Sequence, residues 1–282
     1  MPPLIKRELN PIFNIQPGGN ISPDTSFFGE ISNESFSYFL FNKKIKLIEA
    51  LTVFHFRKTN SEHNVSGLLK KIFDEQSLLR NNYSNAFISY AFDESILTPH
   101  VYYNEGQNLE KIRLIYGDLT EGVILHDDIE ERNLRNIYRV PADIHEVISR
   151  YFPAGKFVHQ YSLLIKQLPN GGNVMKVIFY QQKIVITLMK NGMLQIVQTF
   201  RYTTAEDVVY HMLNTCNQFH TKQINIELSG MIEKNSDLFN RIHKYFLLTG
   251  FSHLPETLSY AAGIEDYPHH FFSHLFSIAL CV

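Results

Sequence analysis

The chain has 282 residues, 44% of them hydrophobic, which suffices for one large core or two modest ones. Its formal net charge of −2, without a basic run, argues against nucleic acid or an anionic membrane surface as a partner. The two cysteines, Cys216 and Cys281, lie outside any C-x-x-C pair, so neither a disulfide framework nor a zinc site is indicated.

The first 20 residues are rich in proline and contain Gly18-Gly19, which predicts a flexible N-terminal arm. No apolar run in this arm has the length of a signal peptide, and no later stretch approaches the roughly 18 apolar residues of a spanning helix. We therefore expect a cytoplasmic protein without direct membrane insertion.

The first half of the chain opens with alternating apolar residues that predict a three-stranded β-meander over 27–54. A helix follows, since apolar residues recur with helical spacing at Val65, Leu68, Leu69, Ile72 and Phe73. A short strand is expected at 86–92 and a further helical segment around 107–117. The acidic stretch 117–136 is predicted to be an irregular surface connection.

The middle of the chain contains the boundary between two lobes. The sequence "IYRVP" at 137–141 reads as a strand, followed by one helix over 142–152 and another around 157–168. Pro153-Ala154-Gly155 separates these helices. We place the boundary there, which gives a first lobe of residues 21–155 and a second lobe of residues 156–282.

The second half begins with another meander, at 174–202, in which Asn191-Gly192 predicts a type I′ turn. Thr203-Thr204-Ala205-Glu206 predicts a capping box at the start of a helix. A strand at 224–229 and a helix at 236–248 follow. The final "LFSIALCV" is expected to be a buried closing strand, and the phenylalanines before and within it, Phe271, Phe272 and Phe276, form either an interface or core, with core favoured.

The two halves align with each other. At an offset of 148 residues Ile31 falls on Phe179 and Leu40 on Leu188, and after the second turn we expect an offset of 149. Both halves then read strand-strand-strand-helix-strand-helix. A chance match is the alternative, because alternating strands align easily with one another. The duplication predicts an α/β protein with two mixed five-stranded sheets flanked by helices.

A duplicated unit of this kind resembles the two ribonuclease H-like lobes of the actin, sugar kinase and Hsp70-type ATPases. More narrowly, "IELSGMIEKNSDLFNRIHKYF" at 226–246 is similar to the actin-like scaffolds of pilus assembly and type II secretion. The whole chain resembles a bacterial family of unknown function with an actin-like ATPase fold. The stretches that support this resemblance are "GEISNESFSYFLFN", "IYRVP", "RYTTAEDVVYHMLN" and "IELSG".

The resemblance implies where a nucleotide would bind. In such ATPases the turn between the first two strands of each lobe presents glycines and an acid to the phosphates and Mg²⁺. Here the turns are 32–35, "SNES", and 180–183, "YQQK", and neither contains a glycine. Glu34 is the one acid, and Ser229-Gly230 matches the turn beside adenosine. These three residues are the candidate cofactor-binding residues.

The sequence therefore favours a non-catalytic scaffold or interaction protein with an unidentified protein partner and no cofactor. The alternative is a protein that binds ATP or ADP with Mg²⁺ between the lobes, or a weak ATPase. Other motifs are weaker. His270 and His274 have the spacing of two metal ligands, but no third ligand is evident beside them, so a metal site is not favoured. The helix start "HEVIS" lacks the second histidine of a zinc protease.

Overall fold

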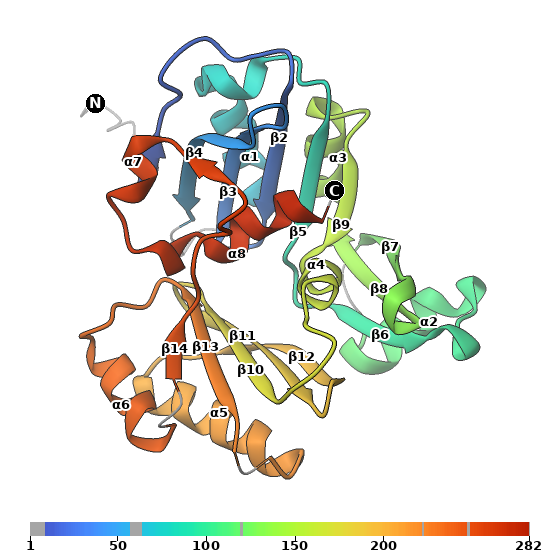
Figure 1. The fold of residues 1–282 in the computed structure, drawn as a ribbon. Helices are drawn as coiled ribbons and strands as arrows, with labels where there is room; N and C mark the ends of the chain where they lie inside the picture. The colour runs from blue at the N-terminus through green and yellow to red at the C-terminus, as the bar shows by residue number, and fades with distance from the viewer. Residues whose placement is uncertain (1–8, 57–63, 119–120, 222, 247–248, 282) are drawn as a thin grey trace, which may run out of the picture. The chain divides into compact units, whose positions relative to one another are not determined.

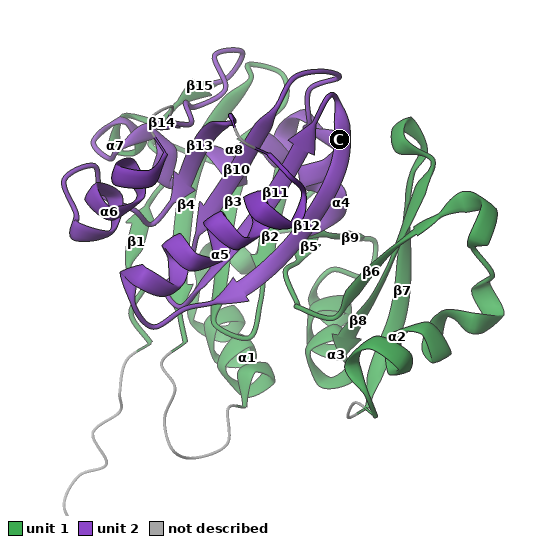
Figure 2. Cartoon of the chain, turned by 90° about the horizontal axis from the view of Figure 1, so that it is seen from below, with its two compact units in different colours: residues 1–160, 259–264 green, residues 161–258, 265–282 purple. Residues whose placement is uncertain are grey.

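A computed structural model of the chain describes residues 9–56, 64–118, 121–221, 223–246 and 249–281. Of the predicted arm at 1–20, residues 1–8 lie outside these residues. The chain divides into two compact units, one of residues 1–160 with 259–264 and one of residues 161–258 with 265–282 (Figure 2). None of the helices within the described residues is long and apolar enough to cross a membrane.

The first unit is built on a mixed sheet with the strand order β1-β4-β3-β2-β5-β9, and β15 pairs with β4 beyond this path (Figure 1). The predicted meander forms β2 to β4, and β5 and β9 continue the sheet in parallel with β2. The strands are β1 (Phe13–Ile15), β2 (Thr25–Ile31), β3 (Ser35–Asn42), β4 (Leu47–His55), β5 (Ala86–Tyr90), β9 (Lys156–His159) and β15 (Ser259–Tyr260). Part of the predicted flexible arm is thus an ordered strand, β1.

Two helices, α1 (Val65–Glu75) and α3 (Ala142–Tyr151), cover one face of this sheet. The Asn64 side chain accepts the Gly67 N–H and so begins α1. Apolar residues at helical spacing on both helices pack on Phe27, Phe36 and Tyr38 of the sheet. The second crossover helix of this unit is α3, followed by β9, and the helix expected at 107–117 has another role.

That helix, α2 (Asn108–Tyr116), belongs to an insertion between β5 and α3. The insertion holds an antiparallel sheet of order β6-β8-β7, with β6 (Ser95–Pro99), β7 (Gly122–Ile129) and β8 (Leu134–Pro141). The expectation of an irregular connection over 117–136 was wrong. Most residues of β7 are half-exposed, so the strand tolerates the acidic residues that made the segment look irregular. The predicted strand at 137–141 is confirmed as the end of β8.

The second unit contains a sheet with the order β12-β11-β10-β13-β14 (Figure 1). Its strands are β10 (Val174–Phe179), β11 (Lys183–Lys190), β12 (Met193–Arg201), β13 (Asn225–Gly230) and β14 (Thr249–Phe251). Asn191 and Gly192 have φ of 51° and 74°, as the predicted two-residue turn requires. The predicted mixed five-stranded sheet is confirmed in this unit, whereas the sheet of the first unit has seven strands because β1 and β15 extend it beyond β4.

Helices cover both faces of this second sheet. On one face α5 (Ala205–Gln218) and α6 (Asp237–Tyr245) pack on Val177, Phe179 and Ile186. On the other lie α4 (Gln160–Lys166) and α8 (Ser273–Phe276), which meet the opposite side chains of β10 and β13 around a small cavity. The expected helix at 157–168 therefore starts only at Gln160, after β9.

The C-terminal segment is helical, which corrects the predicted closing strand. After α8 it forms a 3₁₀ turn, η6 (Ser277–Leu280). Phe272, Phe276 and Ala279 recur at helical spacing and are buried, and a short apolar run of this kind does not distinguish a strand from a helix by itself. The remaining short elements are η1 (Ser77–Arg80), η2 (His100–Tyr102), η3 (Glu105–Gln107), η4 (Glu130–Arg132), α7 (Ala262–Glu265) and η5 (His269–Phe271).

The duplication is visible in the strand registers. Ile31 pairs with Phe36 as Phe179 pairs with Ile184, at the expected offset of 148. The third strands, however, align at an offset of 146, since Phe54 pairs with Phe36 and Phe200 with Ile184. The offset of 149 was wrong because β4 is buried on both faces, so its apolar residues match in either register. The second turn is shorter in the second unit, with two residues between strands against four in the first.

The helix α5 begins with a capping box, as the sequence predicts. Thr204 accepts the Asp207 N–H at 3.2 Å, and Asp207 accepts the Thr204 N–H at 2.9 Å, so the capping box lies one residue later than predicted. Replacing Thr204 with alanine removes the acceptor, and we expect the free energy of unfolding to fall by about 1 kcal/mol in urea titrations. Thr204→Ser keeps the acceptor and is the control. Equal stability of both variants would contradict this role.

Candidate functional site

The turn between the first two strands of the first unit is closed by its own side chain. The Ser32 hydroxyl accepts the backbone N–H groups of Glu34 and Ser35, both at 3.1 Å, and lies 3.0 Å from the Ser35 hydroxyl. The resemblance to actin-like ATPases implies that a phosphate would bind to backbone amides of this turn. In this chain the Ser32 hydroxyl already accepts two of those amides.

Glu34, the candidate acid of this turn, is half-buried. It lies near His55, whose cross-strand neighbour is Ser35. Burial lowers the pKa of His55, and the nearby Glu34 carboxylate opposes that effect. Glu34 thus sits in the first unit beside a histidine, while Ser229 and Gly230 belong to the second unit.

The corresponding turn of the second unit is closed by tyrosines. Tyr180 donates its N–H to the Lys183 carbonyl at 2.9 Å, and the Tyr202 hydroxyl donates to the Tyr180 carbonyl at 2.8 Å. The Lys183 ammonium lies 5.6 Å from the centre of the Tyr180 ring. This turn thus contains a buried lysine, Lys183, and an aromatic ring, Tyr180, but none of its four residues is acidic.

Gly230 is required by the backbone itself. It ends β13 with a φ of +81°, and a Cβ built on it would lie 2.2 Å from the Phe179 carbonyl oxygen. That same oxygen accepts the Met231 N–H at 2.8 Å. Close approach of two backbone segments therefore explains the glycine without a ligand. Its neighbour Ser229 is buried and lines a cavity inside the second unit.

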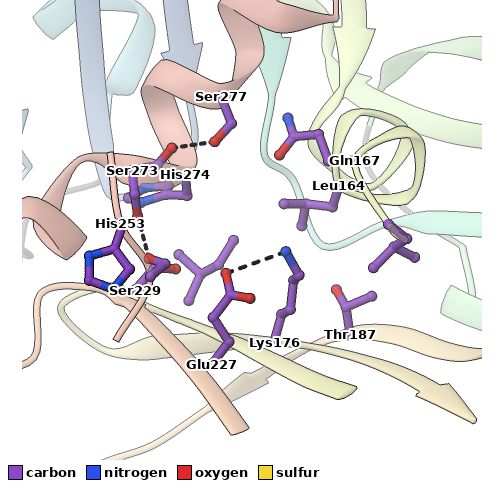
Figure 3. A pocket seen from close by; sticks show the side chains of 13 residues that line it. Leu164, Gln167, Lys176, Thr187, Glu227, Ser229, His253, Ser273, His274 and Ser277 are labelled. Carbon is purple, nitrogen blue, oxygen red and sulfur yellow. Dashed lines mark hydrogen bonds and ion pairs between the residues drawn. The ribbon is translucent and has the colours of Figure 1, made fainter. Parts of the chain in front are cut away.

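This cavity lies between the sheet and helices α4 and α8 and measures about 70 Å³ (Figure 3). Its floor contains an ion pair between Lys176 on β10 and Glu227 on β13, 3.3 Å apart. Ten of the 13 residues that line it are polar or charged, and the other three are Leu164, Leu168 and Ile178. The ten are Gln167, Lys176, Thr187, Glu227, Ser229, Ser252, His253, Ser273, His274 and Ser277. A wider, open hollow shares Gln167, Lys176 and Glu227, so the ion pair is reached from outside.

Three positions of the second sheet that line the cavity are occupied by phenylalanines in the first unit. Lys176, Thr187 and Glu227 are cross-strand neighbours, and their counterparts are Phe28, Phe39 and Phe87. Those rings stack with centroids 4.8 and 4.9 Å from Phe28. One copy of the unit therefore packs its second face with phenylalanines, and the other opens a polar cavity there. This site was not predicted from the sequence, although Lys176 and Glu227 each interrupt an apolar strand.

His274 lines the cavity, whereas His270, four residues earlier, is not among the lining residues. The His270 Nε2–H donates to the Ile232 carbonyl at 2.6 Å, and burial lowers the pKa of this side chain. Burial also lowers the pKa of His274 to about 3, so its ring is neutral near pH 7. The His274 Nδ1 is buried and has no hydrogen-bond partner in the part of the chain that the structure describes.

The size of the cavity limits its chemistry. A volume of about 70 Å³ holds a few water molecules, and it is far too small for a nucleotide. Among the described residues, no three histidine, cysteine or acidic side chains lie close enough together to share a metal ion. The hydroxyls and the ion pair suit bound water or a very small polar molecule.

Solved structures define the class of this fold. A Bacteroides thetaiotaomicron protein with an actin-like ATPase fold and unknown function matches with a TM-score of 0.72 at 19% identity, over 83% of this chain and 94% of that one. The PilM–PilN type IV pilus biogenesis complex matches with a TM-score of 0.57 at 8% identity, over 91% of this chain and 98% of that one. The chain has the actin-like ATPase fold, as predicted.

The family follows from the sequence. Residues 24–247 match the family described as "Protein of unknown function (DUF3822)", and the chain belongs to that family. A search of curated proteins gives no match. The resemblance inferred from the quoted stretches is thereby confirmed for family and fold, while the roles of Glu34, Ser229 and Gly230 stay predictions.

Gly230→Ala tests the structural role of this glycine. Both the φ of +81° and the contact with Phe179 oppose a Cβ, so we expect the free energy of unfolding to fall by at least about 2 kcal/mol. Gly250→Ala in β14 is the matched control, because nothing lies within 4 Å of its added Cβ, and its stability should be unchanged or slightly higher. Equal effects of the two substitutions in urea titrations would overturn the explanation.

The lowered pKa of the buried His274 leads us to expect that the stability of the fold depends on pH. Its pKa is about 3 in the folded chain against 6.5 ordinarily, so between these values the unfolded chain binds the extra proton. Stability should therefore fall as the pH drops from about 6.5 toward 3, by at most about 1.4 kcal/mol per pH unit from this group. His274→Gln should give a shallower slope in urea titrations from pH 7 to 4. An unchanged slope would show that His274 does not titrate as described.

Proposed function

We propose that this protein is a non-catalytic scaffold or interaction protein whose phosphate-binding turns are degenerate, working in the cytoplasm. The observation that carries the proposal is the Ser32 hydroxyl, which accepts the Glu34 and Ser35 amides. A phosphate at this turn would have to displace an intramolecular acceptor. It would also meet a backbone without the glycine that allows close approach.

The second turn supports the same proposal. A phosphate-binding loop offers free amide donors, whereas the Tyr180 N–H already bonds to Lys183 across the turn and the Tyr202 side chain packs against its outside. The Lys183 cation could still attract an anion. It lies beside an aromatic ring, however, and the turn supplies no carboxylate for Mg²⁺.

Exposed apolar side chains support a role in protein contacts. Of the large apolar residues that are exposed, several gather in the insertion of the first unit: Val101, Tyr102, Leu109, Leu114 and Ile115. Leu114 and Val101 are each 84% exposed, which is unusual for side chains without a partner. A protein of similar fold, PilM, is known in a complex with PilN, so this fold is compatible with a scaffold role.

The second candidate is binding of ATP or ADP with Mg²⁺, with or without slow hydrolysis. It is favoured by the position of Glu34 in the turn where an active relative holds its metal-bound water, and by Ser229-Gly230 after a strand. The glycine has a sufficient structural cause in Phe179, which leaves Glu34 as the main support. We rank this candidate below the scaffold.

Thermal unfolding of the full chain with millimolar ATP, ADP and Mg²⁺ tests the proposal. A ligand that binds only the folded state raises the melting temperature by mass action, and 1 kcal/mol corresponds to about 2–4 °C for a chain of this size. We expect a shift below about 1 °C. A larger shift that Glu34→Gln abolishes and Asn33→Gln preserves would replace the scaffold with the nucleotide-binding candidate.

A further inference from the structure

The outer edge of the third meander strand is paired with other strands in the first unit and, in the part of the chain that the structure describes, is unpaired in the second. In the first unit β4 is bordered by β1 over Leu51–Val53 and by β15 over Leu47–Ile48. Its counterpart β12 pairs only with β11 within the described residues, and it ends the strand order of its sheet (Figure 1). One residue of β12 is buried, whereas six of β4 are. The same edge is thus closed in one copy and open in the other.

The hydrogen bonds identify which groups of β12 point outward. The Tyr202 N–H donates inward to the Gln182 carbonyl, and sides alternate along an antiparallel strand, so Val197 and Thr199 direct their N–H and C=O groups away from β11. Their counterparts in β4 are Leu51 and Val53. The Val53 carbonyl accepts the Ile12 N–H at 2.8 Å, which shows how this edge binds an extended segment.

The amino-acid composition of β12 is more typical of an edge strand that pairs with another strand than of one that stays exposed. The stretch from Met193 to Phe200 contains no charged residue and no proline, and Arg201 is the one charged residue of β12. Natural edge strands that stay exposed are usually protected by charged residues or proline. Next to this edge, the exposed Tyr210 on α5 contacts His211, whose ring stacks on Phe200 at 4.7 Å.

We propose that the β12 edge at Val197–Thr199 is a docking site for an extended segment of a partner protein, which adds to the sheet as an antiparallel strand. The partner segment is uncharged and alternates apolar and polar residues, like the chain's own Phe13–Gln16, of which Phe13–Ile15 pair with β4. This inference extends the proposed scaffold role by naming a surface and a kind of partner. It does not depend on whether a nucleotide binds.

The length of the regular edge favours a short peptide over a second copy of the chain. A bulge in the β11–β12 pairing at Leu188/Met189 interrupts the alternation at one end, and at the other end the Arg201 carbonyl accepts a hydrogen bond from His211 Nε2 at 3.3 Å. The outward ladder that a partner strand can use therefore spans only Val197 and Thr199. A pairing of this length buries far less than the roughly 1,200 Å² of a stable interface between folded copies. A flexible segment needs only such a ladder, because the main chain supplies the affinity.

The experiment uses the full chain and a synthetic peptide of residues 10–17, NPIFNIQP, as the probe. Hydrogen exchange of individual amides is followed by NMR with and without millimolar peptide. In the free chain the Val197 and Thr199 amides should exchange much faster than those of Leu51 and Val53. The peptide should slow the Val197 and Thr199 amides at least threefold. A peptide with aspartate in place of Phe13 and Ile15, NPIDNDQP, should have no effect.

A pair of variants tests the outward donor. Val197→Pro removes this N–H at an edge position that tolerates proline, while Val197→Thr keeps it. Peptide protection of Thr199 should be lost in the first variant and kept in the second. If Val197→Pro does not fold, the wild-type protection pattern decides alone. Amides at 197 and 199 that are already protected, or no response to the peptide, would overturn the proposal. Self-association by sedimentation that Val197→Pro abolishes would also overturn it, with a second copy as the occupant.

Discussion

Each unit depends on the parallel pairing between the first strand of its meander and the strand that follows its first helix. In the second unit this is the pairing of β10 with β13, which brings Phe179 against Gly230 at the strand ends. The approach is so close that only glycine fits there. The helices on one face and the cavity on the other are both built on these two strands, since residues on alternate sides of the pair line each of them.

Much of the fold was predictable because its signals are local. Asn191-Gly192 specifies a turn by its allowed φ values, and a period of two or of 3.6 residues distinguishes most strands from helices. The failures have physical causes as well. Nearly every residue of the run "LFSIALCV" is apolar, so the spacing of its apolar residues does not distinguish a strand from a helix. The offset of 146 between the third strands depends on the length of a turn, while burial of both faces of β4 hid the difference.

The candidate site was less predictable, because its residues meet only through the strand register. Lys176 and Glu227 are 51 positions apart, and nothing local shows that β10 and β13 are neighbours. The turn at Ser32 was read correctly as lacking glycine. Its hydroxyl, however, holds two amides, and this contact depends on a side-chain rotamer that composition does not reveal. The open edge of β12 likewise becomes visible only by comparison with β4.

The strand β15 has a consequence for how the protein is made. Ser259 and Tyr260 complete the sheet of the first unit, yet they are synthesised after almost all of the second. During translation the β4 edge at Leu47–Ile48 therefore has no β15 to pair with until about 200 further residues have been synthesised, at roughly 5–20 residues per second. The first unit therefore reaches its final form only after most of the second unit has been synthesised, although each unit has its own core.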